Sequence, residues 1–187
     1  MADTLHSLTA LGQPAPLTHQ VGPYRIEERF DVALASVACR KGRAADVAKA
    51  AKGAGIPLPE PARFTAGNPW SAFWVAPEMW FVEAPFASHE DIVAQVKPVF
   101  GDAASVTEQT DAWVRFDVSA ADLAPLMERL SNVDFARAPD GFATRTVIEH
   151  LGCYLIRHGK GAVTIYGARS SAQSLLHCLE VTAASLL

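Results

Sequence analysis

The chain has 187 residues, of which 50% are hydrophobic and 19% are charged, so it is long enough and apolar enough to form a substantial core. Its formal net charge is −4 and its basic residues are scattered, which excludes the basic surface typical of nucleic-acid-binding proteins. The three cysteines, Cys39, Cys153 and Cys178, stand singly, without the spacing of a zinc site or of a disulfide framework.

The sequence predicts a soluble, cytoplasmic protein that has no membrane or nucleic-acid partner. Isolated cysteines fit reduced thiols in a reducing compartment. The N-terminus has no lysine or arginine before Arg25 and no sustained apolar run, so a secretory signal is not expected. No stretch reaches the roughly 18 unbroken apolar residues of a membrane span.

The chain is predicted to consist of an N-terminal arm, residues 1–23, and a single compact domain, residues 24–187. The arm holds several glycines and prolines among small and polar residues, which prevents a long regular element. Two possibilities stay open for it: a free tail, or an arm that packs on its own domain or on a partner.

The first half of the domain covers about residues 24–104. Its first predicted element is a strand at 32–39, a nearly continuous run of apolar residues. Residues 43–52 have helical spacing, and Gly53 is the expected C-terminal stop. After a proline-rich connection, two tryptophan-bearing strands flank the turn Pro77-Glu78, which predicts a hairpin over residues 71–82. A helix follows, with Ser88 and Asp91 as its capping box, and ends at Pro98 and Gly101.

The second half, about residues 105–187, repeats this order. Residues 113–118 alternate between apolar and polar side chains, as in a half-buried strand. Residues 123–130 carry the apolar stripe of an amphipathic helix, for which Asp122 is the better cap candidate than Ser119. The remaining predicted elements are strands at about 143–149, 152–157 and 162–166, and a final helix capped by Ser170 or Ser171.

The two halves align at a constant offset of 82 residues, which places Val32 and Leu34 on Val114 and Phe116. The similarity is one of pattern, since few identities survive. The sequence therefore predicts an α+β fold made of duplicated strand-helix-strand-strand-helix halves. Helices would cover the faces of one mixed sheet or of two small sheets.

No catalytic, cofactor-binding or metal-binding residue is predicted. The sequence has no nucleotide-binding glycine loop and no nucleophile motif. Several polar groups have a weak functional interpretation, but helix capping, turn formation or solvation explains each of them as well. These groups are His89-Glu90-Asp91, Glu149-His150 with Cys153 and His158, the aspartates Asp111, Asp117 and Asp134, and Ser170-Ser171.

The aromatic segment of the first half is the candidate subunit interface. Alternation along strands sends some large side chains outward, and tryptophan is enriched in binding hot spots. The alternative is a core ribbon within the domain. The candidate interface residues are Trp70, Trp74, Trp80 and Phe86.

Several motifs, in this order, resemble the gamma subunit of heterotetrameric sarcosine oxidase, which is itself similar to the folate-binding fold of glycine-cleavage aminomethyltransferases. One is Trp74-x-x-Pro77-Glu78-x-Trp80, which is similar to the family's Trp-x-x-Pro-acid-acid-Trp signature with Met79 in place of the second acid. The others are Val21–Glu28 followed by Val32–Ser36, Val106–Arg115, Asp134-Phe135, His150–Gly152, Arg169–Ala172 and Ser174-Leu175.

This resemblance implies a non-catalytic subunit of a complex that oxidatively demethylates sarcosine to glycine and passes the one-carbon unit to tetrahydrofolate. The partners would be the alpha, beta and delta subunits. FAD, FMN, NAD and tetrahydrofolate would belong to those subunits and not to this chain. The alternative is a free-standing folate-binding protein of one-carbon metabolism.

The sequence departs from the folate-binding relatives at one strand. Those proteins use a carboxylate near the pterin, whereas the corresponding strand here, Gly152–Arg157, has no acidic residue.

Overall fold

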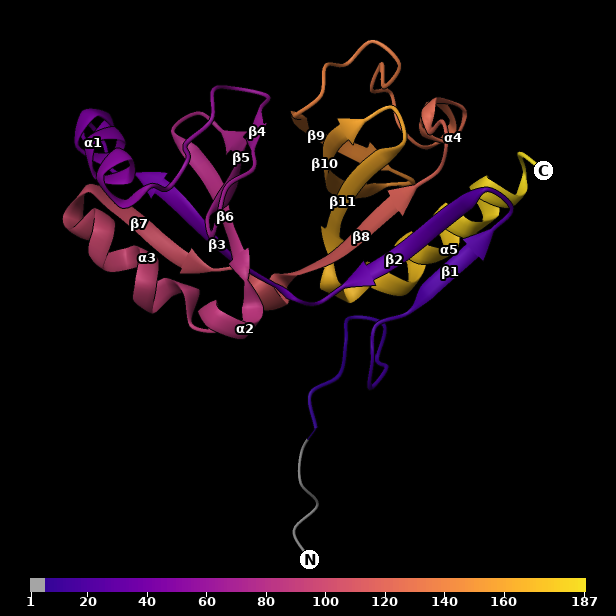
Figure 1. The fold of residues 1–187 in the computed structure, drawn as a ribbon, viewed down its shortest axis with the longest axis horizontal. Helices are drawn as coiled ribbons and strands as arrows, with labels where there is room; N and C mark the ends of the chain where they lie inside the picture. The colour runs from indigo at the N-terminus through magenta and orange to yellow at the C-terminus, as the bar shows by residue number, and fades with distance from the viewer. Residues whose placement is uncertain (1–5) are drawn as a thin grey trace, which may run out of the picture.

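The computed structural model describes residues 6–187, which form two antiparallel β-sheets packed face to face (Figure 1). The strand order of the first sheet is β4-β5-β6-β3-β7, and that of the second sheet is β1-β2-β8-β11-β10-β9. The strands of the first sheet are β3 (Val32–Cys39), β4 (Phe64–Thr65), β5 (Ser71–Ala76), β6 (Met79–Pro85) and β7 (Ala104–Glu108). Those of the second sheet are β1 (Thr18–Val21), β2 (Tyr24–Arg29), β8 (Trp113–Ser119), β9 (Phe142–Ile148), β10 (Leu151–Gly159) and β11 (Ala162–Ala168).

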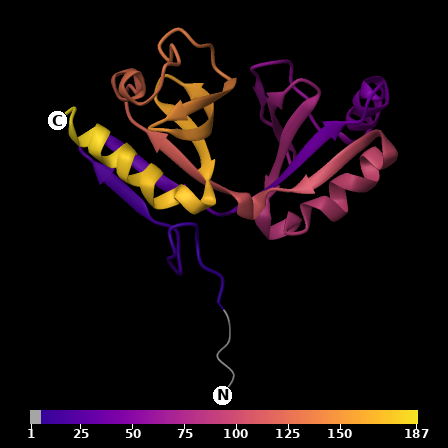
Figure 2. The same ribbon diagram turned by 180° about the vertical axis from the view of Figure 1, so that it is seen from behind.

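Helices cover the outer face of each sheet, so that the molecule has four layers (Figures 1 and 2). Helices α1 (Ala44–Ala54) and α3 (Ile92–Phe100) pack on the first sheet, and α4 (Ala124–Leu130) and α5 (Ala172–Ala184) pack on the second. The short elements are α2 (Phe86–His89) and the 3₁₀ turns η1 (Gly101–Ala103), η2 (Thr110–Ala112) and η3 (Arg169–Ser171). Across residues 6–187, no helix combines the length and apolarity needed to span a bilayer.

The predicted duplication is confirmed by the order in which the strands pair. In the first half, β3-α1-β5-β6-α3-β7 gives the pairing order β5-β6-β3-β7. In the second half, β8-α4-β10-β11-α5 gives β10-β11-β8, and β2 takes the place that corresponds to β7. The α+β class and the two helix-covered sheets therefore agree with the sequence.

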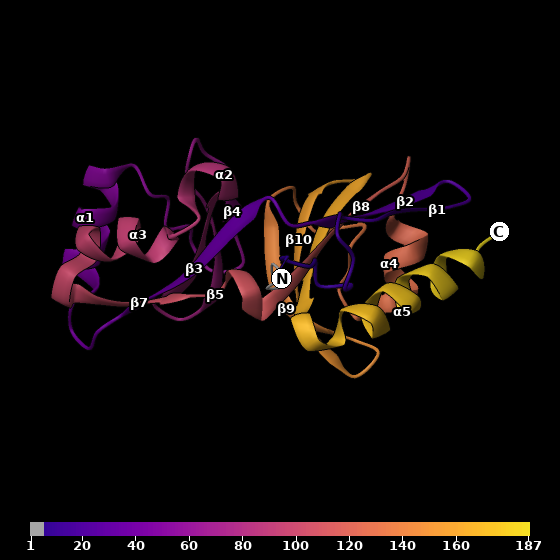
Figure 3. The ribbon, with the colours of Figure 1, turned by 90° about the horizontal axis from the view of Figure 1, so that it is seen from below.

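Strand β2 lies at the start of the first half of the sequence, but it pairs in the second sheet. Only Phe30 and Asp31 separate it from β3, so the chain crosses from one sheet to the other within two residues (Figure 3). Strand β1, which falls in the range expected to be an extended arm, pairs with β2 and forms the edge of the same sheet. The two sheets therefore do not correspond to two continuous halves of the sequence, because the second sheet takes β1 and β2 from the N-terminal part of the chain.

The constant offset of 82 residues aligns the elements of the two halves. In β3 and β8, however, it is wrong by one residue, so the aligned side chains lie on opposite faces of their sheets. Leu34 packs in the layer between the sheets, whereas Phe116, its partner at that offset, packs under the helices of the second sheet. Side chains alternate between the two faces of a strand, so a slip of one residue exchanges the faces. In orientation, Leu34 matches Arg115, because both face the opposite sheet.

An apolar and aromatic layer fills the space between the sheets. Alternation in β5 directs Phe73 and Val75 into this layer, while Ala72 on the other face packs in the core under α1 and α3. Phe73 is fully buried and stacks on Tyr166, with ring centroids 5.5 Å apart. The buried members of the layer are Leu34, Phe73, Val75, Phe81, Ala143, Ile156 and Tyr166.

Several helix ends differ from the sequence predictions. Helix α1 continues through Gly53 and ends at Gly55, whose φ of 68° is the left-handed conformation that glycine adopts at little cost. Asp91, and not Ser88, caps α3, since its carboxylate accepts the N–H of Ala94 at 2.9 Å. Pro98 lies inside α3 and does not end it.

We predict that Phe73→Ala lowers the free energy of unfolding by about 3–5 kcal/mol. The substitution opens a cavity between the two sheets, and the sheets cannot move together to fill it. The matched control is Phe30→Ala, which removes the same atoms from a side chain that is 57% exposed, and should cost no more than about 0.5 kcal/mol. Urea denaturation followed by circular dichroism measures both. Equal losses in the two variants would contradict the prediction.

Candidate functional site

The layer between the sheets contains a buried polar contact that joins the two halves. Tyr166 of β11 donates its hydroxyl hydrogen to Glu83 of β6, with an oxygen–oxygen distance of 2.8 Å. The guanidinium of Arg115, on β8, lies 3.5 Å from the other carboxylate oxygen of Glu83. Glu83 belongs to the first sheet and the other two residues belong to the second, so this contact links the sheets across the apolar layer.

The protonation of these three groups follows from their burial and their mutual proximity. Burial raises the pKa of Glu83, and the positive charge of Arg115 opposes that change. Burial also raises the pKa of Tyr166 well above its usual value, so the phenol stays neutral and remains a donor. Burial alone would lower the pKa of Arg115, but the nearby carboxylates of Glu83 and Asp117 help to raise it well above its usual value, so Arg115 is a cation.

The contact continues as a chain of hydrogen bonds within the second sheet. Arg115 binds both carboxylate oxygens of Asp117, at 2.9 and 3.1 Å. Thr164 donates its hydroxyl hydrogen to Asp117 at 2.6 Å, and its oxygen lies 2.9 Å from Nε2 of His158. Because the hydroxyl has one hydrogen, His158 is the donor in the last of these bonds. We call Glu83, Arg115, Asp117, Thr164 and Tyr166 the inter-sheet network.

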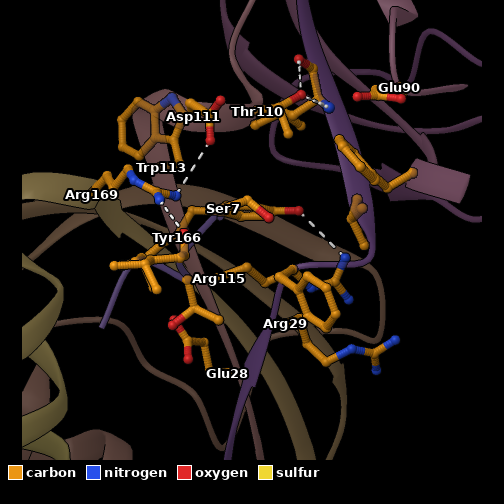
Figure 4. A pocket seen from close by; sticks show the side chains of 18 of the residues that line it. Ser7, Glu28, Arg29, Glu90, Thr110, Asp111, Trp113, Arg115, Tyr166 and Arg169 are labelled. Atoms are coloured by element: carbon orange, nitrogen blue, oxygen red, sulfur yellow. Dashed lines mark hydrogen bonds and ion pairs between the residues drawn. The ribbon is translucent and has the colours of Figure 1, made fainter. Parts of the chain in front are cut away.

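A cavity of about 330 Å³ lies next to the network, where the two links between the sheets run close together. Phe30 of the β2–β3 link lines it beside Arg29, the last residue of β2. Thr110 and Asp111 of the β7–β8 link line it beside Trp113, the first residue of β8 (Figure 4). The segment from Ser7 to Pro14 forms another wall. We call this space the junction cavity.

The arginines that line the junction cavity are already paired with carboxylates. Arg29 makes two hydrogen bonds to Asp31, at 2.6 and 2.9 Å, and these bonds are the largest cause of the raised pKa of Arg29 and the lowered pKa of Asp31. Arg169 lies 3.4 Å from Asp111 and donates to the carbonyl oxygen of Leu8 at 2.8 Å (Figure 4). An anion entering the cavity would therefore have to displace protein carboxylates.

Glu28 is a buried acid at the edge of the junction cavity, and no cation among residues 6–187 forms an ion pair with it. Its two carboxylate oxygens accept the backbone N–H groups of Leu11 and Leu17, at 3.1 and 3.4 Å. Glu28 is only 2% exposed. It therefore fastens the N-terminal segment to β2, which favours the packed arm over the free tail.

The four candidate interface residues are half-buried in the first half of the molecule. Trp80 donates its indole N–H to the carbonyl oxygen of Pro59 at 2.8 Å, and Trp70 packs edge-on against His89, with ring centroids 4.7 Å apart. Trp70, Trp80 and Phe86 also contact the core under α1 and α3. Trp74 lies beside Trp80 in the hairpin. Their role as an interface stays a prediction, and the fold accounts for part of their burial.

The other weak candidates are separated by the fold. Glu149 and His150 form the β9–β10 turn with positive φ, whereas His158 lies at the far end of β10. In residues 6–187, no three His, Cys, Asp or Glu side chains come together as metal ligands would. Of the three aspartates, Asp117 belongs to the inter-sheet network and Asp111 pairs with Arg169.

Sequence reasoning missed Glu83, Arg115, Thr164 and Tyr166, and it also missed the exposed apolar side chains at the surface. Glu83 gives one usable signal, an acid in the middle of the apolar run of β6. Phe30 gives another, an aromatic residue between Arg29 and Asp31 in a two-residue link. The large apolar residues that are more than half exposed are Leu8, Phe30, Val147, Val181 and Leu187.

Comparison with known proteins identifies the fold. No protein-family model matches the chain, and neither does any curated protein sequence. A chain of heterotetrameric sarcosine oxidase from Corynebacterium sp. U-96, solved in complex with pyrrole 2-carboxylate, is similar in structure, with a TM-score of 0.76 and 15% identity. The similarity covers 89% of this chain and 87% of that one.

The glycine cleavage system aminomethyltransferase T from Bartonella henselae is also similar, with a TM-score of 0.56 and 11% identity. The similarity covers 81% of this chain but only 44% of the aminomethyltransferase. These two likenesses confirm the predicted relation in fold.

We predict that Tyr166→Phe lowers the free energy of unfolding by about 1–3 kcal/mol, because it leaves an oxygen of the buried Glu83 without its hydrogen-bond donor. The matched control is Tyr154→Phe in the same layer, since the hydroxyl of Tyr154 makes no hydrogen bond within residues 6–187. That variant should stay within about 0.5 kcal/mol of the wild type. Similar losses from both substitutions would show that the inter-sheet hydrogen bond does not matter.

We also predict that His158 makes the protein less stable in mild acid. Burial, and then the charge of Arg115, lower the pKa of His158 in the folded protein. The unfolded chain therefore binds a proton near the ordinary histidine pKa of about 6.5 while the folded protein does not, so stability falls as the pH drops through that value.

The measurement is the urea midpoint of the wild type and of His158→Asn at a series of pH values from neutral to mildly acidic. His6→Asn, which changes an exposed histidine outside the network, is the control. As the pH falls, the urea midpoint of the wild type should decrease relative to that of His158→Asn. A difference that does not change with pH would overturn the prediction.

Proposed function

We propose that this chain is the non-catalytic gamma subunit of a heterotetrameric sarcosine oxidase, an assembly that oxidatively demethylates sarcosine to glycine. The observation that carries the proposal is the similarity over nearly the whole length of both chains, 89% of this one and 87% of the sarcosine oxidase chain, at a TM-score of 0.76. By contrast, this chain spans less than half of the aminomethyltransferase. The motifs that resemble the gamma-subunit family support the same choice.

The contacts of the charged residues also support a role without catalysis. Arg115 and Glu83 bind each other between the sheets, and Arg29 and Arg169 bind Asp31 and Asp111. These groups stabilise the fold, and reaction chemistry would require them to be released. FAD, FMN, NAD and tetrahydrofolate are therefore proposed to lie on the alpha, beta and delta subunits.

The proposed contribution of this chain is surface for assembly. The aromatic hairpin with Trp70, Trp74 and Trp80 is one proposed contact, and Phe86 is a second part of it. Phe30 and Leu8, which line the junction cavity, add exposed apolar area. Large side chains that are partly exposed in the free subunit would then be covered in the complex.

A free-standing folate-binding protein is the second candidate, because the junction cavity gives it a specific place. That cavity is lined by aromatic side chains as well as by arginines, and the fold is also that of the aminomethyltransferase. Trp113 lines the cavity, so its fluorescence should report occupancy.

We predict that a tagged copy of this chain, purified from its native cells grown on sarcosine, co-purifies with larger chains and shows a flavin absorbance spectrum. The eluate should oxidise sarcosine, whereas the isolated chain should not. An untagged strain controls for adventitious flavoproteins. A colourless single chain from cells that oxidise sarcosine would overturn the subunit assignment.

The folate alternative is tested on the isolated chain by titration with 5-formyltetrahydrofolate, a stable analogue of the reduced cofactor. A subunit without its own folate site should show no saturable change in tryptophan fluorescence. A saturable change that is absent in Trp113→Phe would favour the alternative.

A further inference from the structure

The first sheet ends in an open edge formed by β7. Among residues 6–187, β7 pairs only with β3, on one side. Ser105, Thr107 and Glu108 are exposed, while Val106 is partly buried against the core under α3. Figures 1 and 3 show β7 at the edge of the first sheet, running towards the junction where β8 begins.

The hydrogen bonds to β3 determine which backbone groups of β7 remain open. Gln109 donates its N–H to the carbonyl oxygen of Leu34 at 2.8 Å, and Arg40 donates to Ala103 at 2.9 Å. In an antiparallel ladder, every second residue bonds to a given neighbour. The residues between, which are Ala104, Val106 and Glu108, therefore direct their N–H and C=O groups away from β3.

The second half shows how the corresponding edge is closed. Val106 lies beside Val37, and Ile26 lies beside Val118, and all four side chains pack under the helices of their own half. Val106 of β7 is thus equivalent to Ile26 of β2. Ile26 pairs with His19 of β1, and the ladder continues as the N–H of Glu28 donates to Leu17 at 2.9 Å. Strand β1 therefore occupies the position that is empty beside β7.

Strand β7 lacks three of the features that commonly protect an edge. Natural edge strands are commonly blocked by lysine, by proline or by a bulge. Strand β7 reads Ala-Ser-Val-Thr-Glu, contains neither residue, and pairs with β3 in regular register over its whole length. Its outward backbone groups are thus in the geometry that a further strand requires.

We propose that β7 binds an antiparallel strand of a partner subunit, as β2 binds β1. This inference rests on the proposed function and names one surface through which this chain would join the assembly. Main-chain hydrogen bonds from Ala104, Val106 and Glu108 would provide the attachment. The described part of the N-terminal arm does not supply the strand, because it packs at the junction cavity and leads into β1.

Charge favours a different chain over a second copy of this one. Asp102 precedes β7 with its side chain 95% exposed, and the exposed Glu108 ends it. Arg40 offsets Asp102 only weakly, at 3.9 Å. Two copies of β7 paired antiparallel would bring the acidic start of one strand near the acidic end of the other, which is unfavourable. A partner strand with lysine or arginine near its ends is complementary to both.

Hydrogen–deuterium exchange on the isolated chain and on the purified complex tests the edge directly. The amides of Ala104, Val106 and Glu108 should exchange quickly in the isolated chain and about tenfold or more slowly in the complex. The amides of Ser105 and Thr107, which bond to β3, should be protected in both. Unchanged exchange at the three outward amides would overturn the proposal.

The matched pair Val106→Pro and Val106→Ala tests the contribution to assembly. Both variants lose side-chain packing, but only proline removes the outward N–H, and an edge position tolerates it because that N–H is not used within the fold. Val106→Ala should retain the flavin-bearing chains, and Val106→Pro should retain them about tenfold less well or worse. Circular dichroism of each purified chain checks that it is folded.

The outcomes separate this proposal from the function on which it rests. If wild type and both variants recover the flavin-bearing complex equally, β7 is not the docking edge, and the subunit assignment stands. If the wild type recovers no such complex, the proposed function fails and this inference fails with it. A dimer of the isolated wild-type chain that Val106→Pro abolishes would instead assign the edge to a second copy and overturn the choice of partner.

Discussion

The bond from Tyr166 to Glu83 is the constraint on which the relation between the two halves depends. Each sheet buries its outer face under its own helices, and that packing alone would leave the two halves free to choose their mutual register. A buried carboxylate must keep its hydrogen-bond partners, because a buried charge without partners costs on the order of several kcal/mol. Glu83, Tyr166 and Arg115 therefore favour one alignment of the sheets among those that the apolar side chains would permit. Backbone hydrogen bonds from Phe64 to Gly141 and from Ala143 to Ala62 hold the two halves in the same alignment.

The same layer explains why the polar contact contributes specificity more than net stability. Burying Glu83 carries a desolvation cost that the attraction of Arg115 only partly offsets, so the pKa of Glu83 stays raised. The surrounding aromatic side chains, with Phe73 stacked on Tyr166, provide the larger favourable term through burial of apolar area. Removing the hydroxyl of Tyr166 leaves that area almost unchanged, so the effects of the two kinds of contact are separable.

The duplication is incomplete at one position, and this asymmetry connects the fold with the proposed function. The N-terminal hairpin of β1 and β2 completes the second sheet, and Glu28 holds the preceding segment against it through two backbone N–H groups. The first sheet has β7 in the place of β2 and no counterpart of β1 among the described residues. In a monomeric protein such an unpaired edge promotes aggregation, whereas in a subunit it can pair with a strand of another chain.

The sequence alone determined the class of fold, most of the elements and their repeated order, because these depend on local periodicity and on turn residues. Alternation in Trp113–Val118 and the Pro77-Glu78 turn predicted β8 and the β5–β6 hairpin, and the helical stripe from Leu123 to Leu130 predicted α4. Each of these patterns is contained within about ten residues, so no knowledge of distant contacts was needed.

Only the tertiary structure decided which strands pair, which way the repeated strands face and where the buried charges meet. Glu83 and Tyr166 are 83 residues apart, and nothing near either residue in the chain indicates the other. The assignment of β2 to the second sheet and the one-residue phase shift between Leu34 and Phe116 are of the same kind. The physical reason is that strand partners and strand faces are selected by packing across the whole molecule, and a shift of one residue leaves the local pattern intact while exchanging every side chain between core and opposite face.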